Sequence, residues 1–220
     1  RFYLRTPRLR GLLALTLASA AASSMVIVNT VVIVRDKLGL GQQEVALTLA
    51  AFGAGSILAA FTLPRILDRV SDRVIMLMSG AMLAWLLAIM AVVTYWIGGH
   101  SSYWYALLAG WFAMGIAYSM SVTPLGRLLK RSAKAEDRPA LFAAQFALSH
   151  GCWLICYPLA GQLGAGGDQI LAFVVLSVLA HAGVIGARFL WPAEDPDILA
   201  HSHPDLPPEH THMREDHRTS

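Results

Sequence analysis

The chain has 220 residues, of which 56% are hydrophobic and only 14% are charged. An ordinary soluble domain carries roughly 25% charged residues, so this composition excludes that class and indicates an integral membrane protein. The formal net charge of +3 does not indicate nucleic-acid binding, because the basic residues fall in short segments between apolar stretches, where they orient a chain in a membrane.

The apolar stretches predict six membrane-spanning helices, each near the roughly 20 residues that cross a bilayer. Residues 1–10 are a basic cytoplasmic flank, and residues 11–191 are the transmembrane domain. Residues 192–220, rich in Pro, His and acidic residues, are predicted to be a disordered cytoplasmic tail. The predicted spans are residues 11–34, 45–63, 74–97, 103–122, 140–163 and 170–191.

Lysine and arginine are distributed asymmetrically between the two sides of the predicted membrane domain. With residues 1–10 inside, the inner segments hold fifteen Lys and Arg residues and the outer loops hold two. By the positive-inside rule, both ends of the chain lie in the cytoplasm of a multi-pass protein of the cell inner membrane. Because the chain starts with Arg1 and not with Met, we expect it to be a piece of a longer protein.

The spans differ in their content of polar side chains. The third and sixth spans have few, whereas the other four carry Ser, Thr, Asn, Gln, His or Cys, which need internal partners or a wet cavity in hydrocarbon. Along the chain, two spans suited to the interior of the bundle are followed by one suited to face lipid, and this order then repeats. The repeat predicts an all-α fold of two three-helix units. Ladders of small residues predict close helix packing. Examples are Ala46, Ala50 and Ala54, and Ala143, Ala147 and Gly151.

The loop between the second and third spans contains three arginines and two aspartates within residues 64–73. It resembles the loop motif of major facilitator superfamily transporters: Gly, three residues, Asp, Arg or Lys, two residues, then Arg or Lys. Asp68, Arg69 and Arg73 match that motif. Pro64 stands in place of the Gly, and Asp72 stands where a basic residue is common.

This resemblance covers about residues 5 to 191 and implies the C-terminal six-helix half of a twelve-helix protein. It implies two three-helix inverted repeats, alternating access by rocking, and a missing N-terminal six-helix half of the same protein as partner. It also implies that Asp68, Arg69 and Arg73 form a conformational latch. The alternative is that these charges only set the topology of a solvated turn.

The fifth span has polar and sulfur-containing residues on one helical face. Gln145, Ser149, Cys152 and Cys156 are spaced 4, 3 and 4 residues apart, which predicts either a cavity wall that touches substrate or a hydrogen-bonded helix seam. His150 is a candidate proton carrier, because histidine titrates near neutral pH. The cavity-lining candidates are Ser23, Asn29, Gln145, Ser149, His150 and Cys152.

The tail contains two His-x-His pairs near acidic residues. His201, His203, His210 and His212 are candidate ligands for a divalent metal, because imidazole suits Ni, Co, Zn and Cu. The tail is similar to the His-rich tails of some family members that export nickel or cobalt. The alternative is a low-complexity tail that binds no metal.

The sequence therefore predicts a permease of the major facilitator type that exports a small solute, with no enzymatic activity and no cofactor. Its expected partners are a small-molecule or ion substrate and the lipid bilayer, and no nucleic acid. One alternative is Ni or Co efflux with a His-rich sensing tail. Another is a six-helix metal channel or half-transporter that dimerises, with the tail as its sensor. The alternative of another class is an intramembrane enzyme, although the spans contain neither a Gly-x-Ser-Gly turn nor a His-Glu-x-x-His motif.

Overall fold

The computed structural model describes residues 2–193, and this part of the chain is helical with no strand. Six helices in it are long and apolar enough to cross a membrane, which confirms the predicted all-α fold. Two of them continue directly into a further helical segment, and a short helix, α1 (Phe2–Arg5), precedes them. The bounds are α2 (Pro7–Val31) with the π-helical turn η1 (Val32–Lys37), α3 (Gln42–Leu67), α4 (Asp72–Ile97), α5 (Tyr103–Val122) with α6 (Leu125–Ser132), α7 (Arg138–Ala165) and α8 (Gln169–Leu190).

Local sequence signals account for several helix ends. Pro7 occupies the first turn of α2, where a missing backbone N–H costs nothing. Asp168 caps α8, because its carboxylate accepts a hydrogen bond of 2.8 Å from the backbone N–H of Leu171. Gly39 and Gly167 adopt positive φ angles of 64° and 85° in the turns before α3 and α8, a conformation that side chains disfavour.

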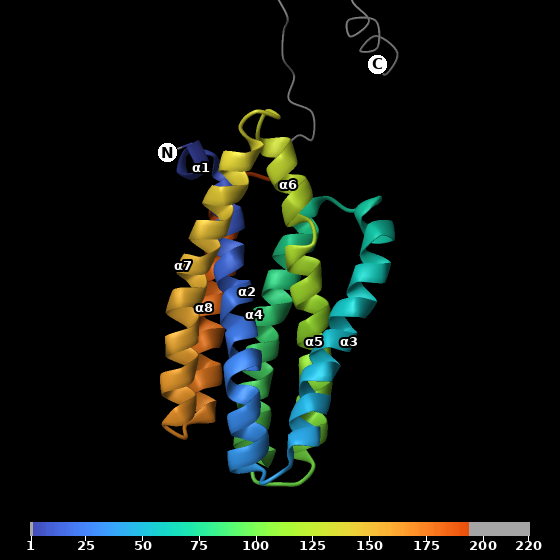
Figure 1. Cartoon of the computed structure of the whole chain (residues 1–220), viewed down its shortest axis with the longest axis vertical. Helices are drawn as coiled ribbons and strands as arrows, with labels where there is room; N and C mark the ends of the chain where they lie inside the picture. Colours follow the sequence, from blue (N-terminus) through green and yellow to red (C-terminus); the bar gives the residue numbers. More distant parts are fainter. Residues whose placement is uncertain (1, 194–220) are drawn as a thin grey trace, which may run out of the picture.

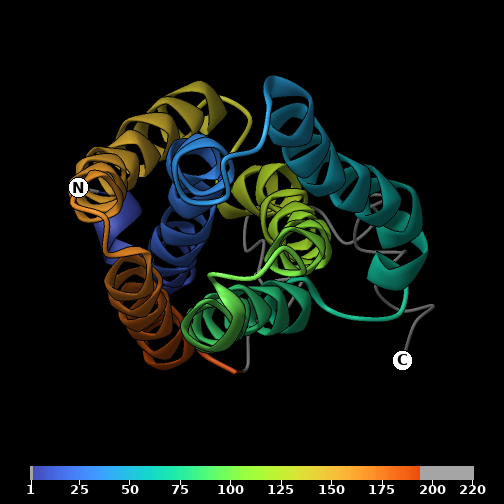
Figure 2. The same cartoon turned by 90° about the horizontal axis from the view of Figure 1, so that it is seen from below.

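The packing of the helices follows a twofold pattern (Figure 2). The middle helix of each three-helix unit packs on the first helix of the other unit, α3 on α5 and α7 on α2. The third helices, α4 and α8, pack on each other and on α5 and α2 respectively. Exchanging α2, α3 and α4 for α5, α7 and α8 leaves this set of partners unchanged, as expected of two repeats with inverted directions.

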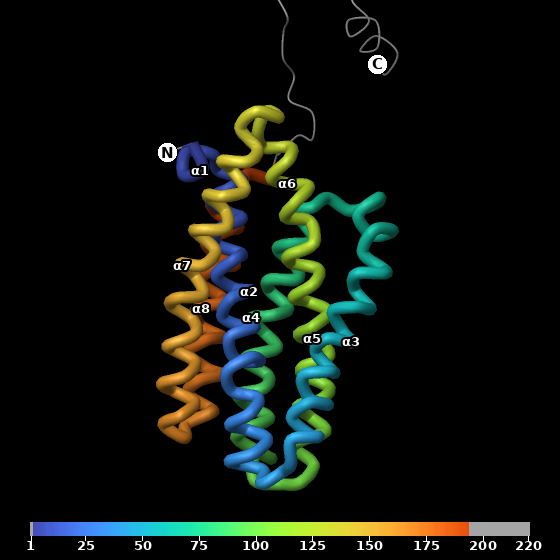
Figure 3. Tube along the Cα trace, viewed as in Figure 1, coloured from blue at the N-terminus to red at the C-terminus, as the bar shows by residue number. Residues whose placement is uncertain are grey.

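The two ends of the bundle differ in charge. We call the end that holds α1, the α3–α4 loop at 68–71 and α6 the basic end (Figure 1), because most of the described arginines and lysines are there. The opposite end holds the turns at 38–41, 98–102 and 166–168. Toward the basic end, the C-terminal part of α3 leans away from the other helices (Figure 3).

Buried polar groups inside the bundle find partners on neighbouring helices. The indole N–H of Trp111 donates to Thr30 Oγ1 at 2.7 Å, and Trp104 donates to Thr48 Oγ1 at 3.0 Å. Ser177 Oγ donates to the carbonyl of Ala84 at 3.0 Å. These bonds join α5 to α2 and α3, and α8 to α4, and they satisfy groups that hydrocarbon would leave unpaired.

Two of the small-residue ladders lie on exposed helix faces. Ala46, Ala50 and Ala54 of α3 are exposed, and so are Ala143, Ala147 and Gly151 of α7. The buried face of α3 is instead formed by Val45, Thr48, Gly55, Ala59 and Leu63. Within the described residues, these two ladders therefore do not make the helix contacts that their spacing predicts.

Candidate solute cavity and charged cluster at the basic end

A cavity of about 520 Å³ lies between α2, α5, α6 and α7, in the half of the bundle nearer the basic end. Most of its wall consists of aliphatic side chains and aromatic rings. The polar side chains in the wall are Thr16, Ser19, Ser121, Gln145 and Ser149, and the aromatic ones are Tyr118, Phe142, Phe146 and Trp153.

Gln145 is held in the wall from two sides. Its Oε1 accepts a hydrogen bond from the hydroxyl of Tyr3, and its Nε2 donates to Thr16 Oγ1 at 3.4 Å. Tyr3 comes from α1 and is buried, and this burial raises the pKa of its phenol, so that the hydroxyl stays protonated and able to donate. This hydrogen bond therefore ties the segment before α2 to the cavity wall at Gln145.

The serine and threonine hydroxyl groups of the wall are bonded within the protein. Ser19 Oγ and Ser121 Oγ lie 2.9 Å apart and join α2 to α5. Thr16 donates to the carbonyl of Leu12 at 2.9 Å, and Ser149 donates to the carbonyl of Phe146 at 2.8 Å. Such back-bonding to the preceding helical turn engages each hydroxyl proton, which leaves these groups mainly as acceptors toward the cavity.

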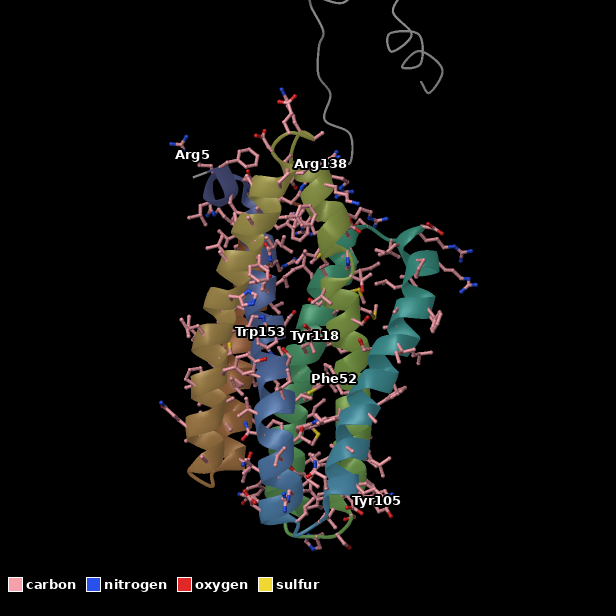
Figure 4. The ribbon with its side chains drawn as sticks, viewed as in Figure 1. Arg5, Phe52, Tyr105, Tyr118, Arg138 and Trp153 are labelled. Carbon is pink, nitrogen blue, oxygen red and sulfur yellow. The ribbon has the colours of Figure 1, made fainter. Side chains whose placement is uncertain are left out.

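Aromatic rings follow one side of α7. The rings of Trp153 and Tyr157 stack with centroids 4.9 Å apart, and the rings of Phe146 and His150 are 4.1 Å apart. Across the cavity, Tyr118 of α5 lies at nearly the same height along the bundle as Trp153 of α7 (Figure 4). The cavity therefore has aromatic surface on two facing helices.

Two of the six cavity candidates predicted from sequence, Gln145 and Ser149, lie in the cavity wall. Cys152 is buried in the core beside it and does not line the cavity. His150 is exposed on α7 outside the wall, and its Nδ1 lies 2.8 Å from the carbonyl oxygen of Phe146.

The two candidates on α2 are buried in helix contacts. Ser23 donates to the carbonyl of Ser19 at 2.6 Å. Asn29 donates from Nδ2 to the carbonyl of Ala160 at 3.1 Å and so joins α2 to α7. Neither side chain lines the cavity.

The aromatic part of the wall was not predicted from the sequence. Phe142, Phe146 and Trp153 are separated by four and seven residues, which places them on one helical face and was the available signal. The same spacing is typical of core aromatics, so it does not by itself distinguish a cavity wall from a packed interior.

A charged cluster lies at the basic end, centred on Asp72, the first residue of α4. Its side chain is buried, and both carboxylate oxygens accept hydrogen bonds of 3.1 Å from Arg127 Nε, with a further bond from Nη2. Arg131 Nη2 lies 3.5 Å from Asp72 Oδ2. The α6 helix presents both arginines one turn apart, and the N-terminus of α4 adds a favourable dipole for the carboxylate.

The three residues of the predicted latch lie in different environments. Asp68 and Arg69 are exposed beyond the end of α3, and Asp68 forms no ion pair with a described residue. Arg73 donates from Nε and Nη2 to the carbonyl oxygen of Trp191, at 3.2 and 3.0 Å. That contact ties the start of α4 to the end of α8, where the buried Trp191 packs against Gly11 of α2.

Within residues 2–193, no group of three or more His, Cys, Asp or Glu side chains is placed to hold a metal ion. The four histidines proposed from sequence as metal ligands, His201, His203, His210 and His212, lie outside the described residues.

Comparison with known proteins identifies a family. Residues 12–212 match the family model described as Major Facilitator Superfamily. No curated protein and no solved structure matches the sequence.

Proposed function

The chain belongs to the major facilitator superfamily, a family of membrane transporters and not of enzymes, and we propose that it carries a small solute outward by alternating access. Membership places the chain in a membrane as a multi-pass protein and gives it a solute as substrate. The direction of transport, the kind of substrate and the orientation of the termini are our proposals.

The observation that carries this proposal is the cavity of about 520 Å³ near the basic end. Its volume falls within the roughly 300–1,000 Å³ that is typical of small-molecule sites, and its wall is largely apolar with a few polar groups, as in such sites. The excess of Lys and Arg at the basic end supports a cytoplasmic location for that end. A solute would then enter the cavity from the cytoplasm, which supports export.

We further propose that a second six-helix unit of the same protein packs on α3 and α7. These two helices are the least buried of the six long helices in the described residues, and their small-residue ladders are exposed. Small side chains allow helix backbones to approach closely in a membrane, so these faces suit helix packing better than simple lipid contact.

The latch also remains a proposal. Asp68 and Arg69 are exposed at the basic end, where charged groups of the second unit would reach them in one conformation of the transport cycle. The nearby cluster of Asp72, Arg127 and Arg131 holds the start of α4 against α6, directly after the loop that carries the exposed Asp68 and Arg69.

The test follows the accessibility of the cavity from the two sides of the membrane. A single cysteine at Ser149, in a background with Cys152→Ala and Cys156→Ala, is treated with an impermeant maleimide in right-side-out and inside-out vesicles. We expect labelling from both faces, faster from the cytoplasmic face. Labelling from one face only would overturn alternating access.

Two matched variants control this experiment. His100→Cys, in an exposed turn at the opposite end, reports the orientation of the vesicles through one-sided labelling. Ser79→Cys, at a buried position of α4, should not react from either face in the folded protein.

A further inference from the structure

We infer that the cavity selects an uncharged, largely apolar solute that carries a flat ring. The inference deepens the proposed transport function and rests on it. No Asp, Glu, Lys, Arg or His side chain is present in the cavity wall among residues 2–193. Each wall group that these residues contribute is therefore either apolar or a neutral polar group.

A wall without counter-charge discriminates strongly against ions. An ion that enters it loses its hydration and gains no opposite charge, and buried charges persist in proteins mainly where they are paired. The polar groups cannot replace the hydration of an anion, because the hydroxyls of Thr16, Ser19 and Ser149 already donate to backbone carbonyls. To a cation they offer only uncharged oxygen acceptors and no carboxylate. Both ends of the Gln145 amide are also engaged, with Tyr3 and Thr16.

One polar group of the wall makes no hydrogen bond with a described residue, the hydroxyl of Tyr118. Tyr118 is half-buried, and its hydroxyl can donate or accept one hydrogen bond. A solute with a single hydroxyl, ether or carbonyl group would satisfy it. A solute with many hydroxyls, such as a sugar, would find few free donors for its oxygens and would leave many of them unpaired at a large cost.

The aromatic side chains specify the apolar part of the solute. Tyr118 and Trp153 face the cavity from α5 and α7, and Phe146 adds a third ring. Aromatic rings prefer offset stacking or edge-to-face contact with other rings, which a flat solute between the two helices can provide. Rings also attract organic cations, so the charge preference has to be measured separately from the ring preference.

The experiment uses three probes that share one ring system and differ in charge: 2-naphthol, trimethyl(2-naphthyl)ammonium and 2-naphthalenesulfonate. Binding to the intact transporter in lipid nanodiscs is measured by equilibrium dialysis at pH 7, with empty nanodiscs as the correction for lipid partitioning. We expect saturable binding of 2-naphthol and at least about thirtyfold weaker binding of both ions. Equal or tighter binding of either ion, or no saturable binding of naphthol, would overturn the inference.

Variants locate the binding in this cavity. Trp153→Ala should weaken naphthol binding by about five- to tenfold, whereas Trp153→Phe should retain most of it. Trp96→Ala removes an exposed tryptophan of α4 outside the wall and should change nothing. Ser149→Asp should shift the preference toward the ammonium probe by at least about tenfold. If Trp153→Ala leaves naphthol binding unchanged, the site lies elsewhere and the inference is overturned.

Different results would overturn the two proposals, alternating access and the substrate class. An ion bound in a Trp153-dependent manner, together with labelling of Ser149→Cys from both faces, would overturn the substrate class and leave alternating access in place. Naphthol bound in a Trp153-dependent manner, together with labelling from one face only, would support the substrate site and overturn alternating access.

Discussion

Gly55 of α3 and Gly115 of α5 make a reciprocal contact. A Cβ atom added to Gly55 would overlap the carbonyl oxygen of Phe112, and one added to Gly115 would overlap the carbonyl oxygen of Phe52. Each glycine lies three residues after the phenylalanine of its own helix, so the two halves of the contact mirror each other. The backbones of α3 and α5 therefore touch at this crossing, where only glycine fits and Cα–H···O contacts can form.

Gly55→Ala is expected to force α3 away from α5, because the added methyl group meets rigid backbone and cannot be accommodated by a side-chain rotation. We expect a loss of about 2 kcal/mol or more, visible as a lower melting temperature in detergent-resistance or fluorescence-detected chromatography assays. Gly53→Ala, on the same helix with no atom within 4 Å of the added methyl, should be neutral. Equal effects of the two variants would contradict the contact.

A second glycine prediction concerns the contact between α7 and α2. A Cβ on Gly164 would overlap Asn29 Oδ1, so Gly164→Ala should disrupt the packing around Asn29 and its bond to Ala160. The matched control is Gly151→Ala on the same helix, where the added methyl meets nothing within 4 Å. Adding Asn29→Ala to Gly164→Ala should recover part of the lost melting temperature, since the clash disappears and the two effects are not additive.

Asp72→Asn is expected to destabilise the basic end, because it leaves Arg127 and Arg131 side by side without their shared carboxylate. Arg127 is partly exposed, so we expect about 2 kcal/mol and not the larger value of a fully buried pair. Asp68→Asn removes an exposed carboxylate four residues earlier and should be close to neutral. The melting temperatures of the two variants, measured at low and at high salt, check both expectations.

Exchanging the charges of Asp72 and Arg127 provides a stricter test of their ion pair. Asp72→Arg combined with Arg127→Asp should be more stable than either single variant, since the opposite charges meet again. Recovery should be incomplete, because an arginine at the start of α4 opposes the helix dipole. A double variant that is less stable than both single variants would contradict a direct pairing.

We expect Ni²⁺ or Co²⁺ to be bound by the His-x-His pairs, because residues 2–193 hold no suitable group of ligands. Calorimetric titration of the full chain with Ni²⁺ and Co²⁺ checks this. We expect any stoichiometric binding to vanish when His201, His203, His210 and His212 are all replaced by Ala. The control replaces two histidines of the described helices, His150 of α7 and His181 of α8, and should leave the binding unchanged. Binding that persists without the four histidines would refute the tail site.

The sequence predicts the six helices well because long apolar runs of membrane length have few alternative structures. It predicts the pairing of charges poorly. Asp68 matches the family motif and Asp72 does not, yet the buried carboxylate that binds Arg127 is Asp72. That contact joins residues 55 positions apart, and only the packing of α6 beside the α3–α4 loop brings them together.

The cavity was predictable only in part. The polar spacing on the fifth span indicated Gln145 and Ser149, whereas the rings of Tyr118 and Trp153 read equally well as core residues. Helical spacing shows which residues share a face, but it does not show whether that face meets another helix or an open space. For the same reason, the alanine ladder of α3 predicted packing on a face that is exposed in the described residues.

The exchange of middle helices between the two units has a consequence for biosynthesis. Because α3 packs on α5, it has no helix to bury its glycine face against when it leaves the ribosome. About 36 residues separate the end of α3 from the start of α5, which at 5–20 residues per second is a wait of roughly two to seven seconds. During that interval lipid or the insertion machinery must shield the helix, so a pause in translation between residues 67 and 103 would lengthen the period in which quality-control proteases can recognise the nascent chain.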